Sequence, residues 1–345
     1  MSPPKKVTID DVALHAGVSK GTVSAVLNDK PTVHSQTRDR VLESIRVLNY
    51  RPEGGARHLK KEKAQSIGLV VKTINNPYVS ALILGVKEYA CEKNYMLYVA
   101  SSEGDHTEEQ LMIEMFLAKD FNGIIISPVL GNPTEINHLF TLRKMNCPFV
   151  LLEDLEGIHA NVVSINNLRA SKEVTRYLFD LGHSEIVYFA GPRYTSHTEE
   201  KLAGFREAFS ESPYIFNQES MVVWCGSQLN EGYQTGMKYF RDKPREEYPT
   251  AISCFNDLAA LGLMSALHEL GIRVPEEISV VGHDDIELAR RWPIPLTTVH
   301  VPIREIGRKA AEVLIKNIES GKALPVELTE MKSKLIVRES TRSLN

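Results

Sequence analysis

The stretch from Thr8 to Asn28 constrains this chain more than any other part of its sequence. Thr8, followed three residues later by Asp11, is a capping-box-like helix start, because its hydroxyl can accept a hydrogen bond from a free helix amide. Gly17 stands where a sharp turn between two helices needs a residue that tolerates positive φ. Ser19 can then cap a second helix. The stretch therefore predicts two short helices joined by a tight turn.

The second of these helices has two different faces. Val23, Val26 and Leu27 recur at the helical spacing and are expected to face a core. The opposite face has no acidic residue and consists of small, polar or cationic residues: Lys20, Gly21, Ser24, Ala25 and Asn28. Such a face can enter a DNA major groove, because short residues allow close approach and hydroxyl groups can meet phosphates. The alternative is a pair of surface helices that cap a larger core.

A third helix, expected to begin at Ser35, would complete a three-helix domain. Its Val41, Ile45 and Leu48 lie at i, i+4 and i+7 and can close a small core against the first two helices. The segment Tyr50–Lys60 follows, with the sequence Tyr-Arg-Pro-Glu-Gly-Gly-Ala-Arg-His-Leu-Lys. Together with the helix-turn-helix stretch, this segment resembles the DNA-binding headpiece and hinge of the lactose-repressor (LacI/GalR) family of bacterial transcription regulators.

The resemblance implies how the domain would contact DNA. It makes Leu59 a minor-groove wedge on a hinge helix at about residues 52–60. It also places Lys20, Gly21 and Ala25 at the family's main base-reading positions, where longer polar side chains are common at the last two. The residues expected to contact DNA are Thr8, Ser19, Lys20, Gly21, Thr22, Ser24, Ala25, Asn28, His34, Thr37, Tyr50, Ala56 and Leu59.

The distribution of charge supports a DNA-binding head on a separate body. The formal charge of the 345 residues is −4, which by itself does not suggest nucleic acid binding. Residues 1–63 nevertheless hold 12 Lys and Arg against 7 Asp and Glu, whereas the remainder holds 28 against 37. A basic segment beside an acidic one is the electrostatic footprint expected of such a protein. We therefore expect a DNA-binding domain at residues 1–60 and an effector-binding and dimerisation domain at 65–345.

Four cysteines, at positions 91, 147, 225 and 254, show no Cys-x-x-Cys spacing and mostly lie in apolar segments. They predict buried, reduced thiols rather than disulfides or a zinc site. The sequence begins without an apolar signal segment and contains no run of 18 apolar residues. These features predict a cytoplasmic protein that does not span a membrane.

After residue 65, apolar runs of four to six residues alternate with longer amphipathic segments, which indicates parallel sheets covered by helices on both faces. The expected strands are 67–71, 96–100, 123–127, 149–152, 162–165, 186–190, 221–224, 251–254, 278–282, 298–301 and 335–337. The expected helices include 78–92, 108–119, 168–181 and 258–270. Two sheets of about six strands or fewer accommodate these strands naturally. We expect one lobe at 65–163 plus 297–322 and another at 164–295 plus 325–345.

The body also resembles the same family over nearly its full length. Among the matching pieces are Asn76-Pro77-Tyr78, Leu202-Ala203-Gly204-Phe205, Val281-Gly282-His283-Asp284-Asp285 and Pro295-Leu296-Thr297-Thr298-Val299. The resemblance implies an α/β body like that of the periplasmic binding proteins, with two doubly wound parallel-sheet lobes. It also implies that the chain after about residue 295 crosses back between the lobes.

Polar residues at strand ends are the candidate contacts for a small effector, because ligands of doubly wound sheets bind where strand carboxyl ends meet helix N-termini. Asp284 looks like the family's cleft aspartate, and Asn256 can both donate and accept hydrogen bonds. Lys201 stands where relatives usually carry an arginine. Tyr78 and Ser101, after the first two strands, are expected to line the other wall. The alternative for each is a satisfied strand-end polar group or helix cap.

Other chemistry is weakly indicated. His283-Asp284-Asp285 could suggest a metal site, but no second cluster at ligand spacing accompanies it. The sequence contains no Gly-x-Ser-x-Gly, no dinucleotide-binding glycine motif after a strand and no P-loop. Glu153, Asp154 and Glu156 are expected to form a solvated loop. We therefore expect no metal, no cofactor and no enzymatic activity.

These observations predict a sequence-specific transcriptional regulator, a repressor by the family's default. Two subunits would bind a pseudo-palindromic double-stranded operator as a homodimer or higher oligomer. A sugar, sugar derivative or nucleobase bound between the lobes would control operator affinity by a population shift. One alternative is a solute-binding receptor, which would need a signal peptide and has no use for residues 8–60. A sugar-acting α/β enzyme would need a catalytic constellation at the strand ends.

Overall fold

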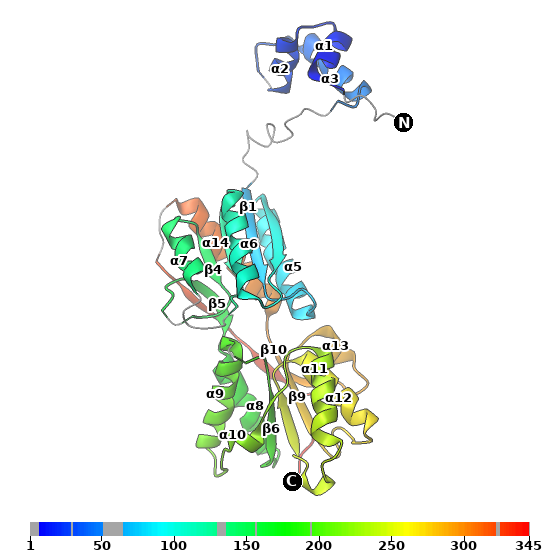
Figure 1. Cartoon of the computed structure of the whole chain (residues 1–345), viewed down its shortest axis with the longest axis vertical. Coiled ribbons are helices and arrows are strands. Elements are labelled where there is room, and N and C mark those ends of the chain that lie inside the picture. Colours follow the sequence, from blue (N-terminus) through cyan, green and yellow to red (C-terminus); the bar gives the residue numbers. More distant parts are fainter. Residues whose placement is uncertain are drawn as a thin grey trace. The chain divides into compact units, whose positions relative to one another are not determined.

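The structure is a computed structural model, and it describes residues 7–28, 30–50, 65–129, 136–155, 157–193, 195–321 and 325–344. The chain separates into two compact units, Met1–Gln65 and Ser66–Asn345 (Figure 1). The hinge expected at about residues 52–60, with Ala56 and Leu59, lies outside the described residues.

The described part of the first unit consists of three helices: α1 (Ile9–Ala16), α2 (Lys20–Leu27) and α3 (Ser35–Val47). Their apolar faces meet in a small core in which Val12, Val23 and Val41 are fully buried. Ile45 and Leu48 pack against this core, as their helical spacing predicts. The helix-turn-helix and its third helix are therefore confirmed.

The second unit contains two six-stranded sheets in the part of the chain that the structure describes. The first sheet has the order β11-β5-β4-β3-β1-β2, with β1 (Gln65–Val71), β2 (Tyr95–Ser101), β3 (Gly123–Ile126), β4 (Phe149–Leu151), β5 (Asn161–Ile165) and β11 (Leu328–Met331). The second has the order β12-β10-β9-β8-β6-β7, with β6 (Ile186–Ala190), β7 (Val222–Trp224), β8 (Ala251–Cys254), β9 (Ser279–Asp284), β10 (Thr297–His300) and β12 (Lys334–Ile336). The strands from β1 through β3, β4 and β5 to β11 run parallel, as do β6 to β10. The β10–β12 pair is antiparallel.

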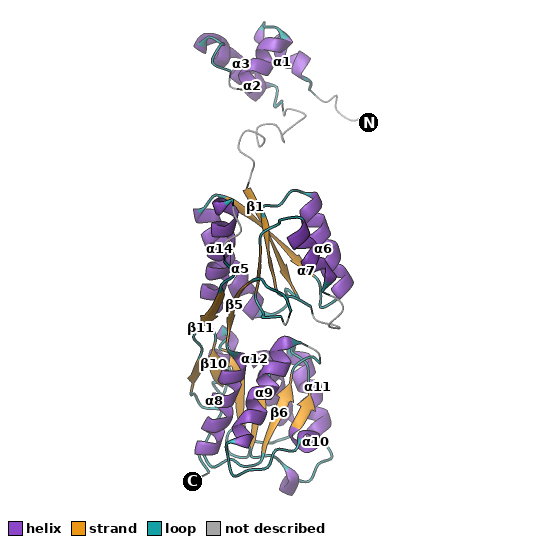
Figure 2. Ribbon diagram, turned by 90° about the vertical axis from the view of Figure 1, so that its left-hand side faces the viewer, coloured by secondary structure: helices purple, strands orange, loops and turns teal. Residues whose placement is uncertain are grey.

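Helices cover both faces of each sheet, so each lobe is doubly wound. The helices of the first lobe are α5 (Pro77–Glu92), α6 (His106–Ala118), α7 (Asn137–Lys144) and α14 (Ile303–Ser320). Figure 2 shows α5 and α14 on one side of β1 and α6 and α7 on the other. Neighbouring residues of β1 therefore face different layers: Leu69 packs with α5 and α14, whereas Val70 packs with α6. This two-sided burial explains the continuous apolar runs in the sequence.

The second lobe follows the same plan. Its helices are α8 (Asn167–Asp180), α9 (Ser196–Ser210), α10 (Gln218–Met221), α11 (Leu229–Phe240), α12 (Asp257–Glu269) and α13 (Glu287–Arg291), with a 3-10 turn at Arg245–Glu247. Tyr188 of β6 packs toward α8 and α9, and its neighbour Phe189 packs toward α11 and α12. The predicted α/β architecture of two doubly wound lobes is confirmed.

The chain crosses between the lobes at three places, and two of them differ from the predicted lobe boundaries. We expected residues 297–322 in the first lobe, but β10 at Thr297–His300 pairs with β9 of the second sheet. We expected residues 325–345 in the second lobe, but β11 at Leu328–Met331 pairs with β5 of the first sheet. Ladder hydrogen bonds decide lobe membership, so the crossings lie immediately after β5, β10 and β11.

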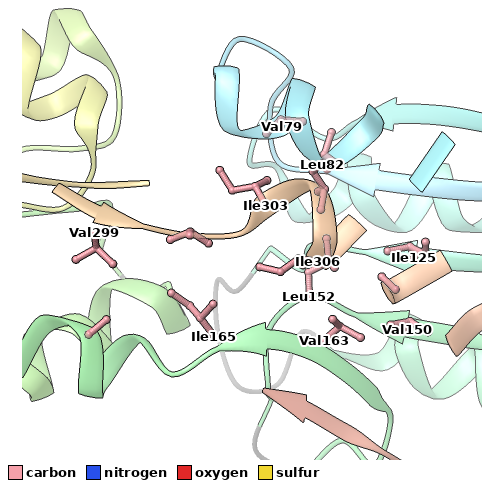
Figure 3. Packing of buried hydrophobic residues seen from close by; sticks show 14 of the residues in the cluster. Val79, Leu82, Ile125, Val150, Leu152, Val163, Ile165, Val299, Ile303 and Ile306 are labelled. Atoms are coloured by element: carbon pink, nitrogen blue, oxygen red, sulfur yellow. The ribbon is translucent and has the colours of Figure 1, made fainter. Parts of the chain in front are cut away.

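Helices α5 and α14 approach each other unusually closely in the first lobe. A Cβ added at Gly85 would lie 1.9 Å from the carbonyl oxygen of Arg304, and one at Gly307 would lie 2.3 Å from that of Leu82. Figure 3 shows Leu82 of α5 and Ile306 of α14 within the cluster of buried residues that this contact joins. The glycines therefore let the two backbones meet, which brings α14 back onto the first lobe after the second crossing.

Replacing Gly85 by Ala is expected to lower the free energy of unfolding by about 1–3 kcal/mol, because the added methyl group meets backbone atoms that cannot move aside. Ser80→Ala, at an exposed position of the same helix, is the matched control and is expected to change stability by less than about 0.5 kcal/mol. Urea denaturation of both full-length variants measures the difference. Equal stability of the two variants would contradict the close-packing argument.

Two further sequence expectations concern thiols and membrane spans. Cys225 and Cys254 are buried, as predicted, but Cys147 is half-buried and Cys91 is exposed on α5. All four are free thiols. The expectation of burial was wrong for Cys91 because it faces solvent from a helix that covers the sheet with its other side. Among the described residues, no helix has the length and apolar character needed to cross a membrane.

Candidate DNA-binding surface and ligand cavity

The turn between α1 and α2 is built from the residues that the sequence singled out. Thr8 and Asp11 form a capping box at the start of α1, and Gly17 ends this helix at φ 61°. The Ser19 hydroxyl accepts a hydrogen bond from the Thr22 amide at 3.1 Å and caps α2. Because both helix ends are satisfied locally, the angle between α1 and α2 is fixed by short-range contacts.

The predicted DNA-contacting face of α2 lies on the outside of the three-helix unit. Lys20, Gly21 and Asn28 are exposed, and Ser24 and Ala25 are half-buried. Lys20 is not a free cation, because its Nζ donates to Asp10 Oδ2 at 2.9 Å. This exposed pair can exchange for a phosphate or a base edge at small cost, since surface ion pairs contribute little.

The remaining predicted DNA contacts fall into three groups. Thr8 and His34 are exposed where α1 and α3 begin, and Thr37 is half-buried in the first turn of α3. Tyr50 is only 9 % exposed and packs into the small core, so the structure gives it a packing role that the sequence analysis did not include. Ala56 and Leu59 lie outside the described residues.

A cavity of about 160 Å³ lies in the second unit and is lined by residues of both lobes. Its walls come from the carboxyl ends of β1, β4 and β5 in the first lobe and of β6, β8 and β9 in the second. This is the position at which doubly wound sheets bind ligands. Its polar lining consists of Lys72, Thr73, Asn76, Tyr78, Ser127, Glu153, Ser164, Asn167, Thr195, His197, Lys201, Ser227, Asn256, His283 and Asp284.

Four of the five predicted effector residues line this cavity: Tyr78, Lys201, Asn256 and Asp284. Ser101 does not, so the expectation that it lines a wall was wrong. It ends β2, which is the edge strand of the first sheet, and its hydroxyl donates to Glu103 Oε1 at 2.5 Å. The sequence correctly placed Ser101 at the carboxyl end of a strand. That strand, β2, lies at the edge of the sheet, beyond β1, and its end does not reach the cavity.

Asp284 is held in an unusual backbone conformation at the end of β9. Its φ is 115° and that of Asp285 is 60°, both in the left-handed region that L residues rarely adopt. The Asp285 carboxylate accepts hydrogen bonds from Arg290 and Arg338, with His300 Nδ1 2.8 Å away. Strain of this kind persists only where the surroundings fix it, and it often marks functional sites.

The Asp284 carboxylate is buried and accepts no hydrogen bond from any residue that the structure describes. Burial raises the pKa of Asp284 to about 7, and the nearby Lys201 opposes this shift only in part. A carboxylate that lines a cavity and has no hydrogen-bond partner among the described residues can accept a hydrogen bond from a ligand donor. This is the property expected of a ligand-binding carboxylate.

Lys201 and Asn256 have structural contacts as well as cavity-facing positions. The Lys201 ammonium donates to the Phe255 carbonyl at 2.9 Å and lies 4.4 Å from the centre of the Phe255 ring. Burial lowers the pKa of Lys201 to about 8, with Asp284 acting in the opposite direction. Asn256 caps α12 through Ala259 and donates to the Ser227 carbonyl. The alternative of a satisfied helix cap therefore describes Asn256 well.

The first-lobe wall contains a charged pair that the sequence analysis missed. Glu153 is 1 % exposed and accepts hydrogen bonds from Lys72, Ser127 and Ser196. Its burial acts to raise the pKa, but the charges of His197 and Lys72 and the hydrogen bonds from Lys72 and Ser196 hold the pKa of Glu153 at about 2. Burial also lowers the pKa of His197 to about 4, so at neutral pH the compensating charge is that of Lys72.

The expectation of a solvated acidic loop was therefore wrong for Glu153, although Asp154 is exposed and Glu156 lies outside the described residues. Glu153 follows the apolar end of β4 directly, so the strand-end rule that selected Asp284 would also have selected it. The triplet His283-Asp284-Asp285 does not converge on one point, because Asp285 is committed to Arg290 and Arg338.

Aromatic side chains add apolar surface to the cavity. Phe255 lies against Gly191, where an added Cβ would come within 2.5 Å of the ring, and Tyr78 belongs to the first lobe's share of the lining. Trp224 and Trp292 pack against core clusters and are not part of the lining.

A three-helix DNA-binding motif followed by a two-lobed body with a ligand-sized cavity defines a ligand-responsive transcriptional regulator. Residues 8–53 match the family model of bacterial regulatory proteins of the lacI family, and residues 175–341 match that of the periplasmic binding protein-like domain. The chain belongs to the LacI family of bacterial transcriptional regulators. It combines the helix-turn-helix DNA-binding domain of that family with an effector-binding body.

Relatives match this chain over almost its whole length. The HTH-type transcriptional repressor PurR of Vibrio parahaemolyticus is 33 % identical over 339 residues, covering 98 % of this chain and 99 % of the relative. PurR of Vibrio cholerae is 34 % identical, covering 98 % of both. These relatives are transcriptional repressors rather than enzymes or solute receptors.

Solved structures of family members share the fold. The Lac repressor dimer bound to operator and the anti-inducer ONPF has a TM-score of 0.80 at 26 % identity, covering 98 % of this chain and all of that chain. The complex of the transcriptional regulator CelR with cellobiose has a TM-score of 0.71 at 25 % identity, covering 97 % and 100 %.

Neutralising Asp284 and Asp285 separately is expected to change stability in opposite directions. The pKa of Asp284 is raised from 3.8 to about 7, so the folded state loses stability as pH rises through this range. The Asp284→Asn variant should not lose stability in this way, so between pH 3.8 and about 7 it should become increasingly more stable than wild type. The pKa of Lys201, at about 8, lies above this pH range.

Asp285→Asn is the matched control at the neighbouring position. Although burial opposes ionisation, hydrogen bonds from Arg290 and Arg338 hold the pKa of Asp285 below its ordinary value. The ionised form therefore stabilises the fold above pH 3.8, and the variant should be less stable than wild type there. Thermal unfolding as a function of pH measures both effects, and the same sign for both variants would contradict this description.

Proposed function

We propose that this chain is a repressor that binds a pseudo-palindromic operator as a homodimer. Its affinity for the operator falls or rises when a small polar molecule occupies the cavity. The observation that carries the proposal is the buried Asp284 carboxylate, which lines a cavity shared by both lobes and has no hydrogen-bond partner among the described residues. The same chain carries a helix-turn-helix whose second helix has an exposed, acid-free face.

The DNA contact is proposed to run through the exposed face of α2. Gly21 and Ala25 allow close approach to base edges, and Lys20 supplies a cation that can leave Asp10 for the DNA. Ser19, Thr22, Ser24, Asn28, His34 and Thr37 are proposed to position the helix through phosphates. Ala56 and Leu59 are proposed to act in the minor groove, by the family resemblance alone.

Dimerisation is proposed to cover one apolar face of the first lobe. Exposed apolar side chains of α5, β2 and α6 supply this face: Leu84, Met96, Tyr98, Val99, Leu111 and Met115. An uncovered apolar edge strand such as β2 is a liability in a monomer. The Lac repressor relative was solved as a dimer on its operator, which supports the same arrangement here.

The effector is proposed to be an uncharged sugar, sugar derivative or nucleobase. Glu153 is already balanced by Lys72, and Asp284 is close to Lys201, so the cavity has little net charge to offer an ionic ligand. Tyr78 and Phe255 provide flat apolar surface, while Asp284 provides an acceptor for hydroxyl or ring N–H groups. The CelR relative was solved with cellobiose.

Ligand binding is proposed to act on the arrangement of the lobes. The Ser196 hydroxyl of the second lobe donates to the Glu153 carboxylate of the first, so the two walls are already joined across the cavity. A ligand that contacts both walls favours one relative position of the lobes by its difference in affinity. The DNA affinity of the dimer would follow that shift in population.

Lys20→Gln is expected to weaken operator binding by about 1–3 kcal/mol and to relax sequence preference, since a base-reading or phosphate-binding cation is lost. DNA selected from a random pool by the wild-type protein serves as the operator, and fluorescence anisotropy measures affinity. Lys93→Gln, at an exposed position of the body, is the control. Equal affinity of both variants, or failure to select any sequence, would contradict the proposal.

Asp284→Asn is expected to lower effector affinity by about 1.5–3 kcal/mol, the contribution of a hydrogen bond to a charged group. A thermal-shift screen of sugars and purines identifies the ligand first, because binding to the folded state raises its stability. Calorimetric titration then compares wild type, Asp284→Asn and the control Ser101→Ala, whose side chain lies outside the cavity. Wild-type affinity in Asp284→Asn would remove this residue from the site.

A further inference from the structure

His283 is a buried polar residue that no part of the proposed function uses. It belongs to β9 and lines the ligand cavity, yet it is only 4 % exposed. Its Nε2 has no hydrogen-bond partner among the described residues. A buried polar atom without a partner is costly, so such atoms are rare unless a ligand or water satisfies them.

A second buried histidine of the same lobe shows what a structural histidine looks like here. His183 is 1 % exposed, and its Nδ1 and Nε2 lie 3.0 Å from Thr250 Oγ1 and 3.1 Å from the Arg342 carbonyl oxygen. One ring nitrogen therefore contacts the residue before β8, and the other contacts the C-terminal segment. His283 is buried to nearly the same extent, but its Nε2 makes no comparable contact with any described residue.

The ring of His283 can present a nitrogen to the cavity without loss of a structural contact. A half turn about χ2 keeps the ring in its place and exchanges its nitrogens with ring carbons, and this torsion is broad for histidine. Since no described residue fixes Nε2, the turn breaks no hydrogen bond at that atom. The side chain that lines the cavity can therefore adapt to what occupies it.

The imidazole is neutral in this setting. Burial lowers the pKa of His283 well below its ordinary value, and the nearby Lys201 and His197 act in the same direction. A neutral imidazole offers one donor and one acceptor, and it does not attract an anion as an imidazolium would. The hydroxyl, amide and ring N–H groups of the uncharged effectors proposed above can therefore satisfy it.

We propose that His283 is a specificity-determining residue of this cavity, hydrogen-bonded in the complex to an uncharged polar group of the effector. The inference rests on the proposed function, because it requires that the cavity bind a ligand. It adds a second contact beside Asp284 that selects a different kind of group: the Asp284 carboxylate binds a donor, whereas the His283 imidazole can bind a donor or an acceptor.

The test compares His283→Phe with the matched control His183→Phe in the full-length protein. Phe preserves a planar ring of similar size and removes both nitrogens. Without ligand, His283→Phe is expected to melt at the wild-type temperature or above, because no partnered hydrogen bond is lost. His183→Phe is expected to melt lower, since two hydrogen bonds are lost.

The ligand arm uses a panel of D-ribose, D-galactose, cellobiose, adenine, hypoxanthine and guanine. For any member that binds wild type, His283→Phe is expected to weaken binding about threefold to tenfold, as for one neutral hydrogen bond. His283→Gln should restore part of the loss. One analogue that lacks a single polar group should bind wild type and His283→Phe equally, which identifies the group that His283 contacts.

The outcomes separate the inference from the function on which it rests. Equal ligand affinity of wild type and His283→Phe overturns the inference alone and leaves the proposed function standing. A fall in melting temperature equal to that of His183→Phe also overturns it, because His283 would then be structural. If no panel member binds wild type, the proposed effector class fails and the inference falls with it.

Discussion

The second-lobe wall of the cavity depends on one buried carboxyl group, that of Asp257. It is fully buried, and it accepts hydrogen bonds from the Thr298 hydroxyl at 2.5 Å and from the Ile286 amide at 2.9 Å. These contacts tie the start of α12, strand β10 and the turn after β9 together. Gly282 is needed beside it, since an added Cβ would lie 2.2 Å from Asp257 Oδ1. Asp284 sits in its left-handed conformation because Asp257 anchors the turn on one side and Asp285 anchors it on the other.

The two walls of the cavity bury charge in different ways. Glu153 is satisfied by Lys72, Ser127 and Ser196, so removing any partner would leave a buried anion undercompensated. The Asp284 side chain has no hydrogen-bond partner among the described residues, and its backbone has a φ of 115° in the turn after β9. A ligand that donates to Asp284 therefore gains more than one that donates to Glu153. The second-lobe wall, where the Asp284 carboxylate is free to accept a hydrogen bond, can therefore discriminate among ligands.

The sequence predicted what is set by local patterns and failed where distant pairing decides. Helix caps at Thr8 and Ser19 and the apolar central strands depend on neighbouring residues, and they agree with the structure closely. Strand β11 was missed because Leu328–Met331 is an edge strand with alternating exposed residues rather than an apolar run. Ser101 was misplaced because the position of β2 at the edge of the sheet cannot be predicted from the residues of that strand. Glu153 was set aside because an acidic triplet resembles a solvated loop until its partners from other strands are known.

The crossings between the lobes limit how a bound ligand can move them. Connections of at most two residues join β5 to α8, β10 to α14 and β11 to β12, and the Asn166 side chain donates to Glu330 at 3.4 Å beside two of these crossings. Three short connections at one edge resist sliding of the lobes and permit rotation about that edge, as in hinge closure. Such a rotation changes the distance between the first-lobe wall, with Lys72 and Glu153, and the second-lobe wall, with Asp284. A ligand that contacts both walls therefore acts on the rotation of the lobes, which is the motion that the crossings permit.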